Sequence, residues 1–132
     1  MPYLVAYITA IIAFFIIDFI WIGIVASGFY NEQIGHLRGR KVNIPAAVIF
    51  YLIYIAGILV FAVKPALAVD ALRPAIIYGA LFGFFCYAIY DFTNYATLEG
   101  WPLKMVVVDI VWGVFLTTSV ATTAAWAALK FG

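Results

Sequence analysis

Charged residues and cysteine are scarce in this sequence of 132 residues. Asp, Glu, Lys and Arg make up 10% of it, whereas hydrophobic residues make up 68%. Such a composition excludes an ordinary soluble domain and indicates a membrane protein. The single cysteine, Cys86, excludes a disulfide within the chain and is most simply a small apolar core residue. The formal net charge of +1 gives no sign of nucleic-acid binding, and we predict none.

Motifs for metal binding and nucleophilic catalysis are also missing. His36 is the only histidine, so the sequence has no H-x-x-x-H pair, and no paired E-x-x-H unit occurs. Neither Ser27 nor Ser119 lies in a recognisable nucleophile motif. We therefore predict no metal ion and no cofactor, although oxygen and imidazole ligands exist at Asp18, Asp91, Asp109, Glu32 and His36.

The sequence does contain four long apolar runs, at about residues 3–27, 44–63, 74–97 and 102–129. A membrane-spanning helix needs about 20 mostly apolar residues, and these runs reach that length. They lack the alternating polarity of membrane β-strands. Because short connections make consecutive helices antiparallel neighbours, we predict an all-α polytopic membrane protein. The expected fold is an antiparallel four-helix transmembrane bundle, a single domain over residues 1–132 with both termini on one side.

Proline and glycine positions agree with these boundaries. Pro45, Pro74 and Pro102 each lie near the start of a span, where a missing N–H breaks no helical hydrogen bond. Gly100 follows the third span. The first run differs from a secretory signal because it has no basic segment before it, is too long and contains Asp18. We expect it to be a retained helix.

The basic residues near the ends of the spans predict an orientation. Four lie on one side of the membrane and three on the other: Arg38, Arg40, Lys41 and Lys104 against Lys64, Arg73 and Lys130. Lys and Arg are more frequent in cytoplasmic loops than in exported ones. We therefore expect a multi-pass protein of the cell membrane with both termini on the periplasmic or extracellular side.

Three aspartates interrupt the apolar spans. Asp18, Asp91 and Asp109 lie in different spans, and no lysine or arginine lies at matching depth. A carboxyl in hydrocarbon costs roughly 3 kcal/mol or more, so it normally faces the bundle interior, water or a partner. Antiparallel connectivity places all three about 10–13 Å below one membrane face. A common layer favours a functional site, although each acid alone could be a neutral, hydrogen-bonded structural group.

Each aspartate has companions at helical spacing, because residues three or four apart share a helix face. Trp21 follows Asp18, Trp112 follows Asp109, and Asn94 follows Asp91. Tyrosines of the second and third spans lie at comparable depth. The predicted site for a substrate or proton comprises Asp18, Asp91, Asp109, Asn94, Trp21, Trp112, Tyr87, Tyr90, Tyr51 and Tyr54.

The connection over residues 27–43 faces the same layer and combines apolar and charged side chains. Its apolar residues can share one side of a short helix lying in the headgroup region. We interpret it as a lipid-anchoring loop or as a lid formed by His36, Arg38 and Arg40. In a lid, Arg38 or Arg40 would pair with an acid below or with a lipid phosphate.

Gly79 and Gly83 form a G-x-x-x-G pair in the third span. Small residues at this spacing let helices approach closely in a membrane. The pair is interpreted either as packing against another helix of the same chain or as a homodimer interface. A homodimer would suit a transporter, because the space inside four helices is narrow.

The run YAIYDFTNYATLEGWPLKMVVVDIVWG, residues 87–113, and the early D-F-I-W-x-G carry distinctive motifs. Through Y-D-F-T-N-x-A-T-L-x-G-W-P and D-x-x-W-G the chain resembles, over essentially its whole length, a family of small uncharacterised bacterial four-helix membrane proteins. The resemblance implies one domain of four spans in a bacterial inner membrane, and it implies no activity. Residues in the family's pattern are Asp18, Trp21, Tyr90, Asp91, Asn94, Trp101, Asp109 and Trp112.

The residues favour a binding and transport protein whose acidic and aromatic layer takes up a proton-linked cation or small amphiphile. One alternative is a membrane-embedded enzyme acting on a lipid or isoprenoid, with one acid as general acid or base. Another is a non-catalytic assembly subunit whose polar layer binds a partner helix. A water path from the layer to the face with Lys64 and Arg73 would favour the transporter. An apolar tunnel that opens sideways from the layer would favour the enzyme, and a sealed polar cluster would favour the assembly subunit.

Overall fold

The computed structural model describes residues 1–21, 23 and 44–132, and within these every regular element is a helix. The elements are α1 (Pro2–Ile20), α3 (Ile44–Ile58), the π-helix η3 (Leu59–Val63), α4 (Lys64–Ala68), α5 (Arg73–Thr97) and α6 (Leu103–Phe131). Since α3, η3 and α4 are continuous, the described residues contain four helices long and apolar enough to cross a membrane. The predicted all-α four-helix membrane bundle is confirmed.

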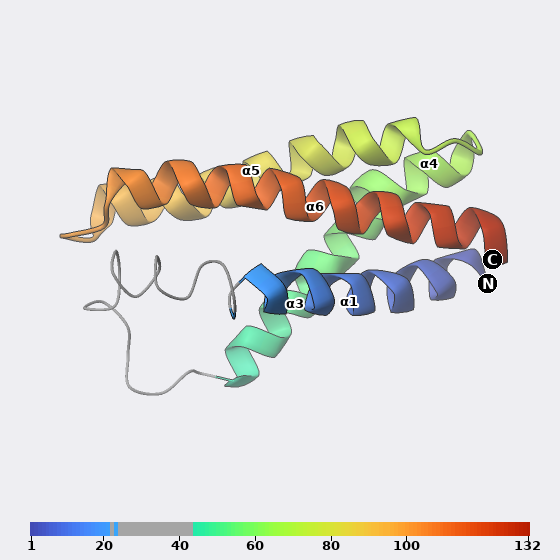
Figure 1. Ribbon diagram of the computed structural model, residues 1–132, viewed down its shortest axis with the longest axis horizontal. Helices are drawn as coiled ribbons and strands as arrows, with labels where there is room; N and C mark the ends of the chain where they lie inside the picture. Colours follow the sequence, from blue (N-terminus) through green and yellow to red (C-terminus); the bar gives the residue numbers. More distant parts are fainter. Residues whose placement is uncertain (22, 24–43) are drawn as a thin grey trace.

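Three of the spans lie side by side, and the fourth crosses them. α6 packs along α5 and also along α1, and Figure 1 shows both chain termini at one end of the molecule. The second span runs obliquely past the other helices, so that the beginning of α3 lies away from the end of α5 (Figure 1).

The close contact between α5 and α6 depends on the two glycines of the G-x-x-x-G pair. A Cβ atom added to Gly83 would lie 2.6 Å from the Gly113 carbonyl oxygen and 2.7 Å from Cβ of Thr117. At Gly79 it would lie 3.0 Å from Cβ of Ala121. The pair therefore packs against α6 of the same chain, as one of the two interpretations expected.

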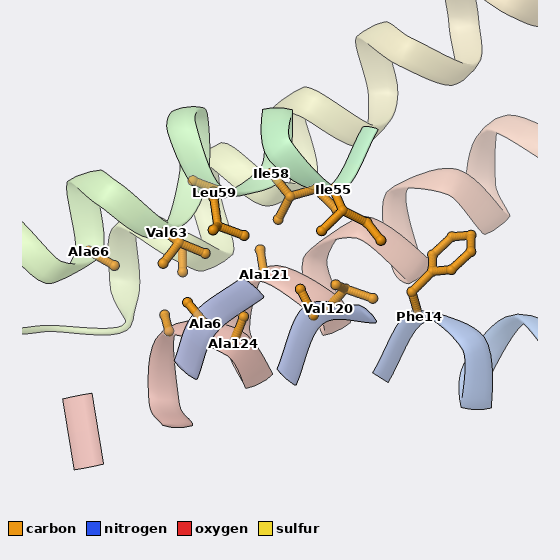
Figure 2. Packing of buried hydrophobic residues seen from close by; sticks show 14 of the residues in the cluster. Ala6, Phe14, Ile55, Ile58, Leu59, Val63, Ala66, Val120, Ala121 and Ala124 are labelled. Carbon is orange, nitrogen blue, oxygen red and sulfur yellow. The ribbon is translucent and has the colours of Figure 1, made fainter. Parts of the chain in front are cut away.

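The half of the bundle that contains the termini has a core of small and branched apolar residues (Figure 2). Fully buried members are Ala6, Ala10, Ile58, Ala62, Val63, Ala66, Val120, Ala121, Ala124 and Ala125. The buried polar side chains of the described residues are Asp91, Asp109 and Thr117. Thr117 lies at the middle of α6 and the two acids lie beyond it, so apolar packing seals the terminal half.

The second span contains a local change of helix type next to a proline. Pro65 has no N–H, and its ring clashes with the carbonyl group four residues earlier in a regular α-helix. Here the N–H of Lys64 is donated to the Leu59 carbonyl, five residues back, which is π-helical bonding. This wider turn accommodates Pro65, and the helical stretch continues to Ala68, beyond the expected end at residue 63.

The turn from α4 to α5 is fixed by backbone hydrogen bonds around Asp70, whose φ is 53°. The N–H of Ala71 is donated to the Ala66 carbonyl at 3.1 Å, and that of Asp70 to the Leu67 carbonyl at 3.4 Å. These are the two bonds of a Schellman motif, in which the left-handed position usually holds glycine. Aspartate tolerates this conformation better than most residues do.

Candidate functional site

Three helices bring the aspartates together near the α5–α6 connection. Asp91 is fully buried between α5 and α6, Asp109 is 6% exposed, and Asp18 on α1 is half-buried. The Asp91 and Asp109 carboxyls lie within hydrogen-bonding reach of each other, and Asp18 lies within electrostatic reach of Asp109. Asp91 and Asp109 are each about 9 Å from the helix end at the connection. The three acids therefore share one layer; its role remains a prediction.

The surroundings of Asp91 are unusual for a buried acid. Both carboxyl oxygens are buried, and neither has an ordinary hydrogen-bond partner among the described residues. The adjacent polar group is the Asp109 carboxyl. Two carboxylates at this distance would repel strongly, whereas one proton placed between them converts the pair into a donor and an acceptor. The pair can therefore hold one proton.

Asn94 does not join Asp91, although the sequence spacing suggested that it would. Its half-buried side chain lies within hydrogen-bonding reach of the Tyr90 hydroxyl. Tyr90 is 54% exposed, and its ring packs edge-on against Trp101 with centroids 6.0 Å apart. Tyr90 is also within electrostatic reach of Asp109. The amide thus belongs to the rim of the site.

Two tryptophans form an aromatic wall beside Asp18. The rings of Trp21 and Trp112 stack with centroids 4.2 Å apart and planes inclined by 9°. The indole of Trp112 lies within hydrogen-bonding reach of the Asp18 carboxyl, and an indole N–H can only donate. This interaction sets the position of the Asp18 carboxyl against the wall.

The predicted tyrosines lie on the other side of Asp18 and below it. Tyr51 and Tyr54 are both within electrostatic reach of Asp18. Tyr54 is buried, shares a hydrogen bond with the Thr117 hydroxyl, and lies within hydrogen-bonding reach of Tyr87. The ring of Tyr87 occupies the space left by Gly113, because a Cβ atom there would collide with it.

Comparison with known families decides what kind of protein this is. A family model described as "Predicted membrane protein (DUF2177)" matches residues 3–126. The chain belongs to this family. The match includes all three spans that carry the aspartates, and it confirms the expected membership of a membrane-protein family of unknown function. Neither the comparison with curated proteins nor that with solved structures finds a match.

Sequence reasoning omitted two parts of the site in this DUF2177 chain. Trp101 is buried with Met105 and Val106 on the connection side of the acid pair. Met105 precedes Asp109 by four residues, so it covers the pair from that side. Thr117 was also omitted, although a threonine inside a span is a hydrogen-bonding group that needs a partner. Trp101 could have been found, because it lies in the family's pattern.

Some predictions for the DUF2177 chain fall outside what the structure describes. His36, Arg38 and Arg40, the expected headgroup or lid residues, lie outside the described residues. Within residues 1–21, 23 and 44–132, no group of three His, Cys, Asp or Glu side chains is arranged to hold a metal ion. The candidate site therefore consists of carboxyl, hydroxyl and indole groups.

Proposed function

We propose that this protein is a proton-linked transporter that binds a small amphiphilic cation at Asp18 and holds a proton between Asp91 and Asp109. The observation that carries the proposal is the unequal exposure of the three acids. Asp18 is half-buried and remains accessible, whereas Asp91 is fully enclosed with Asp109 beside it. Each acid therefore has a different task.

The proton is assigned to the enclosed pair. A buried carboxylate without a hydrogen-bond donor is costly, and two adjacent ones are costlier still. A single shared proton removes one of the two charges and supplies the missing donor.

The cation is assigned to Asp18 and its aromatic surroundings. α1 contains no lysine or arginine that could neutralise this carboxylate. Trp112 lies within hydrogen-bonding reach of it, Trp21 stacks on Trp112, and Tyr51 lies within electrostatic reach of it. Aromatic rings of this kind can attract an organic cation. An amine or quaternary ammonium with an apolar body would pair its charge with Asp18 and leave its tail among apolar helices.

Exchange follows from the proximity of Asp18 to Asp109. Charges a few ångströms apart in a protein interact by on the order of 1 kcal/mol or more. A cation at Asp18 therefore favours the doubly ionised state of the Asp91–Asp109 pair, and its binding releases the proton. Protonation of the pair in turn weakens cation binding, as linkage requires.

Transport requires a rearrangement, because the terminal half of the bundle is sealed. Ala, Val and Ile side chains fill that half without a buried polar residue among them. The lack of a buried polar path through the described part of that half supports a site reached from the other face, as in one state of an alternating-access cycle. A continuous channel does not fit this packing.

The test is proton release from purified protein in weakly buffered detergent on addition of tetraphenylphosphonium or dodecylamine. Wild type is expected to release protons saturably. Asp18→Asn should abolish cation binding, and Asp91→Asn should bind the cation without releasing a proton. Asp70→Asn, in the exposed turn, is the matched control. Release that is unaffected by both site variants would overturn the proposal.

Uptake by proteoliposomes then tests the transport step. An imposed pH gradient should drive accumulation of the same cation in wild type, and Asp91→Asn should abolish the dependence on the gradient. If the protein binds the cation and releases a proton but the proteoliposomes take up no cation, the protein is a binding protein and the transport proposal is refuted.

A membrane-embedded enzyme is the second candidate, and the same acid pair favours it. Two carboxyls that share a proton can act as general acid and general base. Incubation with lipid and isoprenoid substrates followed by mass spectrometry would reveal a product that Asp91→Asn does not form.

A further inference from the structure

The first half of α3 is only loosely attached to the bundle. Between Ile44 and Ile53 no residue is buried, and these two residues are 66% and 67% exposed. Burial begins at Tyr54 and continues through Ile55 and Ile58. Figure 1 shows the same feature as a helix whose beginning diverges from α1 and α5.

A hinge lies at the other end of α3. The π-helix Leu59–Val63 and Pro65 follow it directly. Helices bend at prolines and at π-helical turns, because the backbone hydrogen bonds there are fewer or longer. Ala62 and Val63, inside the π-helix, and Ala66, after it, are fully buried, so this end of the second span is anchored in the terminal core.

A buried polar contact joins α3 to α6. The hydroxyl groups of Tyr54 and Thr117 share a hydrogen bond in the buried interior. Around it, the Phe14 ring packs against Tyr54 at 5.7 Å and against Tyr51 at 5.1 Å between centroids. Tyr51 and Tyr54 are also the α3 residues within electrostatic reach of Asp18. The same contact therefore holds α3 and closes the side of the site next to α1.

We propose that α3 is a lateral gate, hinged at the π-helix and held shut by the burial of Ile55 and Ile58 and by the Tyr54–Thr117 hydrogen bond. When it swings outward, Asp18 opens to the hydrocarbon phase between α1 and α3. An amphiphilic ligand enters there from the bilayer. The identity of that ligand rests on the proposed function, whereas the swing of α3 does not.

The gate is tested by distances between pairs of nitroxide labels in liposomes, without any ligand. In a Cys86→Ala background, one pair joins Phe50→Cys on α3 to Val111→Cys on α6. A reference pair joins Phe92→Cys on α5 to Val107→Cys on α6. All four labelled positions are exposed. The first pair should show two distances, and the reference pair one.

Loss of the hydrogen bond should favour the longer distance. Tyr54→Phe and Thr117→Val each remove one hydroxyl, and each should raise the open-to-closed ratio about fivefold, as expected for one hydrogen bond. Tyr78→Phe, which removes an exposed hydroxyl on α5, is the control and should change nothing. An unchanged reference distance shows that the variants are folded.

A single distance for the α3 pair that neither variant changes would overturn the gate. So would an equal response to Tyr78→Phe. Because these readouts need no ligand, they are independent of proton release. If α3 shows two distances but the protein releases no proton, the gate proposal stands and the proposed function is refuted.

Discussion

Replacing Gly83 by alanine tests the close approach of α5 to α6. The added Cβ would lie 2.6 Å from the Gly113 carbonyl oxygen and within 2.8 Å of the Thr117 hydroxyl oxygen. The first of these atoms is backbone, so it cannot rotate away. Relief of such a contact requires the helices to separate, and overpacking of this kind costs about 1–3 kcal/mol.

Helix propensity acts in the opposite direction. Alanine is better than glycine in a helix interior by about 1 kcal/mol. At Gly83 the backbone contact makes the steric cost the larger of the two, and we expect a net loss of up to about 2 kcal/mol in the free energy of unfolding. At Gly79 the nearest atom is Cβ of Ala121 at 3.0 Å. There the two effects nearly cancel, and we expect a change below about 1 kcal/mol.

The assay is equilibrium unfolding in mixed micelles with increasing SDS, followed by tryptophan fluorescence and circular dichroism. Ile89→Ala, at an exposed position of α5, controls for a simple change of side chain. The close-packing argument is refuted if Gly83→Ala stabilises the protein by the propensity gain, or if Gly79→Ala is the more damaging of the two.

Three further predictions concern other parts of the molecule. Asp70→Gly should stabilise the protein by about 0.5–1 kcal/mol, because glycine adopts a positive φ without strain; SDS unfolding checks it, and a loss would contradict the turn geometry. Trp112→Phe removes the N–H near Asp18 and disturbs the stack on Trp21. Cation affinity in the proton-release assay should therefore fall about tenfold or more. Unchanged affinity would refute a role of the aromatic wall in cation binding. A reporter fused at Gly132 should read periplasmic, and a cytoplasmic signal would reverse the predicted orientation.

Long apolar runs and short connections made the four spans predictable, because their length and continuity leave few alternatives in a membrane. The same connectivity placed the three aspartates at one depth. The contact between Asp91 and Asp109 could not be predicted in this way. It depends on how far α5 and α6 are rotated about their own axes, which spacing within one helix does not determine.

Two differences between the sequence-based expectations and the structure have local causes. Asn94 was grouped with Asp91 because three residues separate them, yet Asp91 faces α6 while Asn94 reaches Tyr90 one turn back. The second span was expected to end at residue 63, shortly before Pro65. A proline normally interrupts a helix, but the π-helical turn lets this one continue. Hydropathy alone carries no information on such a turn.

The sealed terminal half also determines where the proposed site would lie within the electric field across the membrane. With the hydrocarbon core about 30 Å thick and the acid layer about 9 Å below one face, an ion that reaches the layer crosses roughly a third of the field. At 100 mV this corresponds to about 0.7 kcal/mol, or about a threefold change in affinity. In the predicted orientation the layer is nearer the cytoplasm, so an inside-negative potential would oppose loading of a cation alone from that side, whereas a cation that displaces the shared proton to the same side moves no net charge through the field. A cation that then crosses the apolar half passes through the remaining two thirds of the field, so that part of the electrical work would belong to the rearrangement of this half.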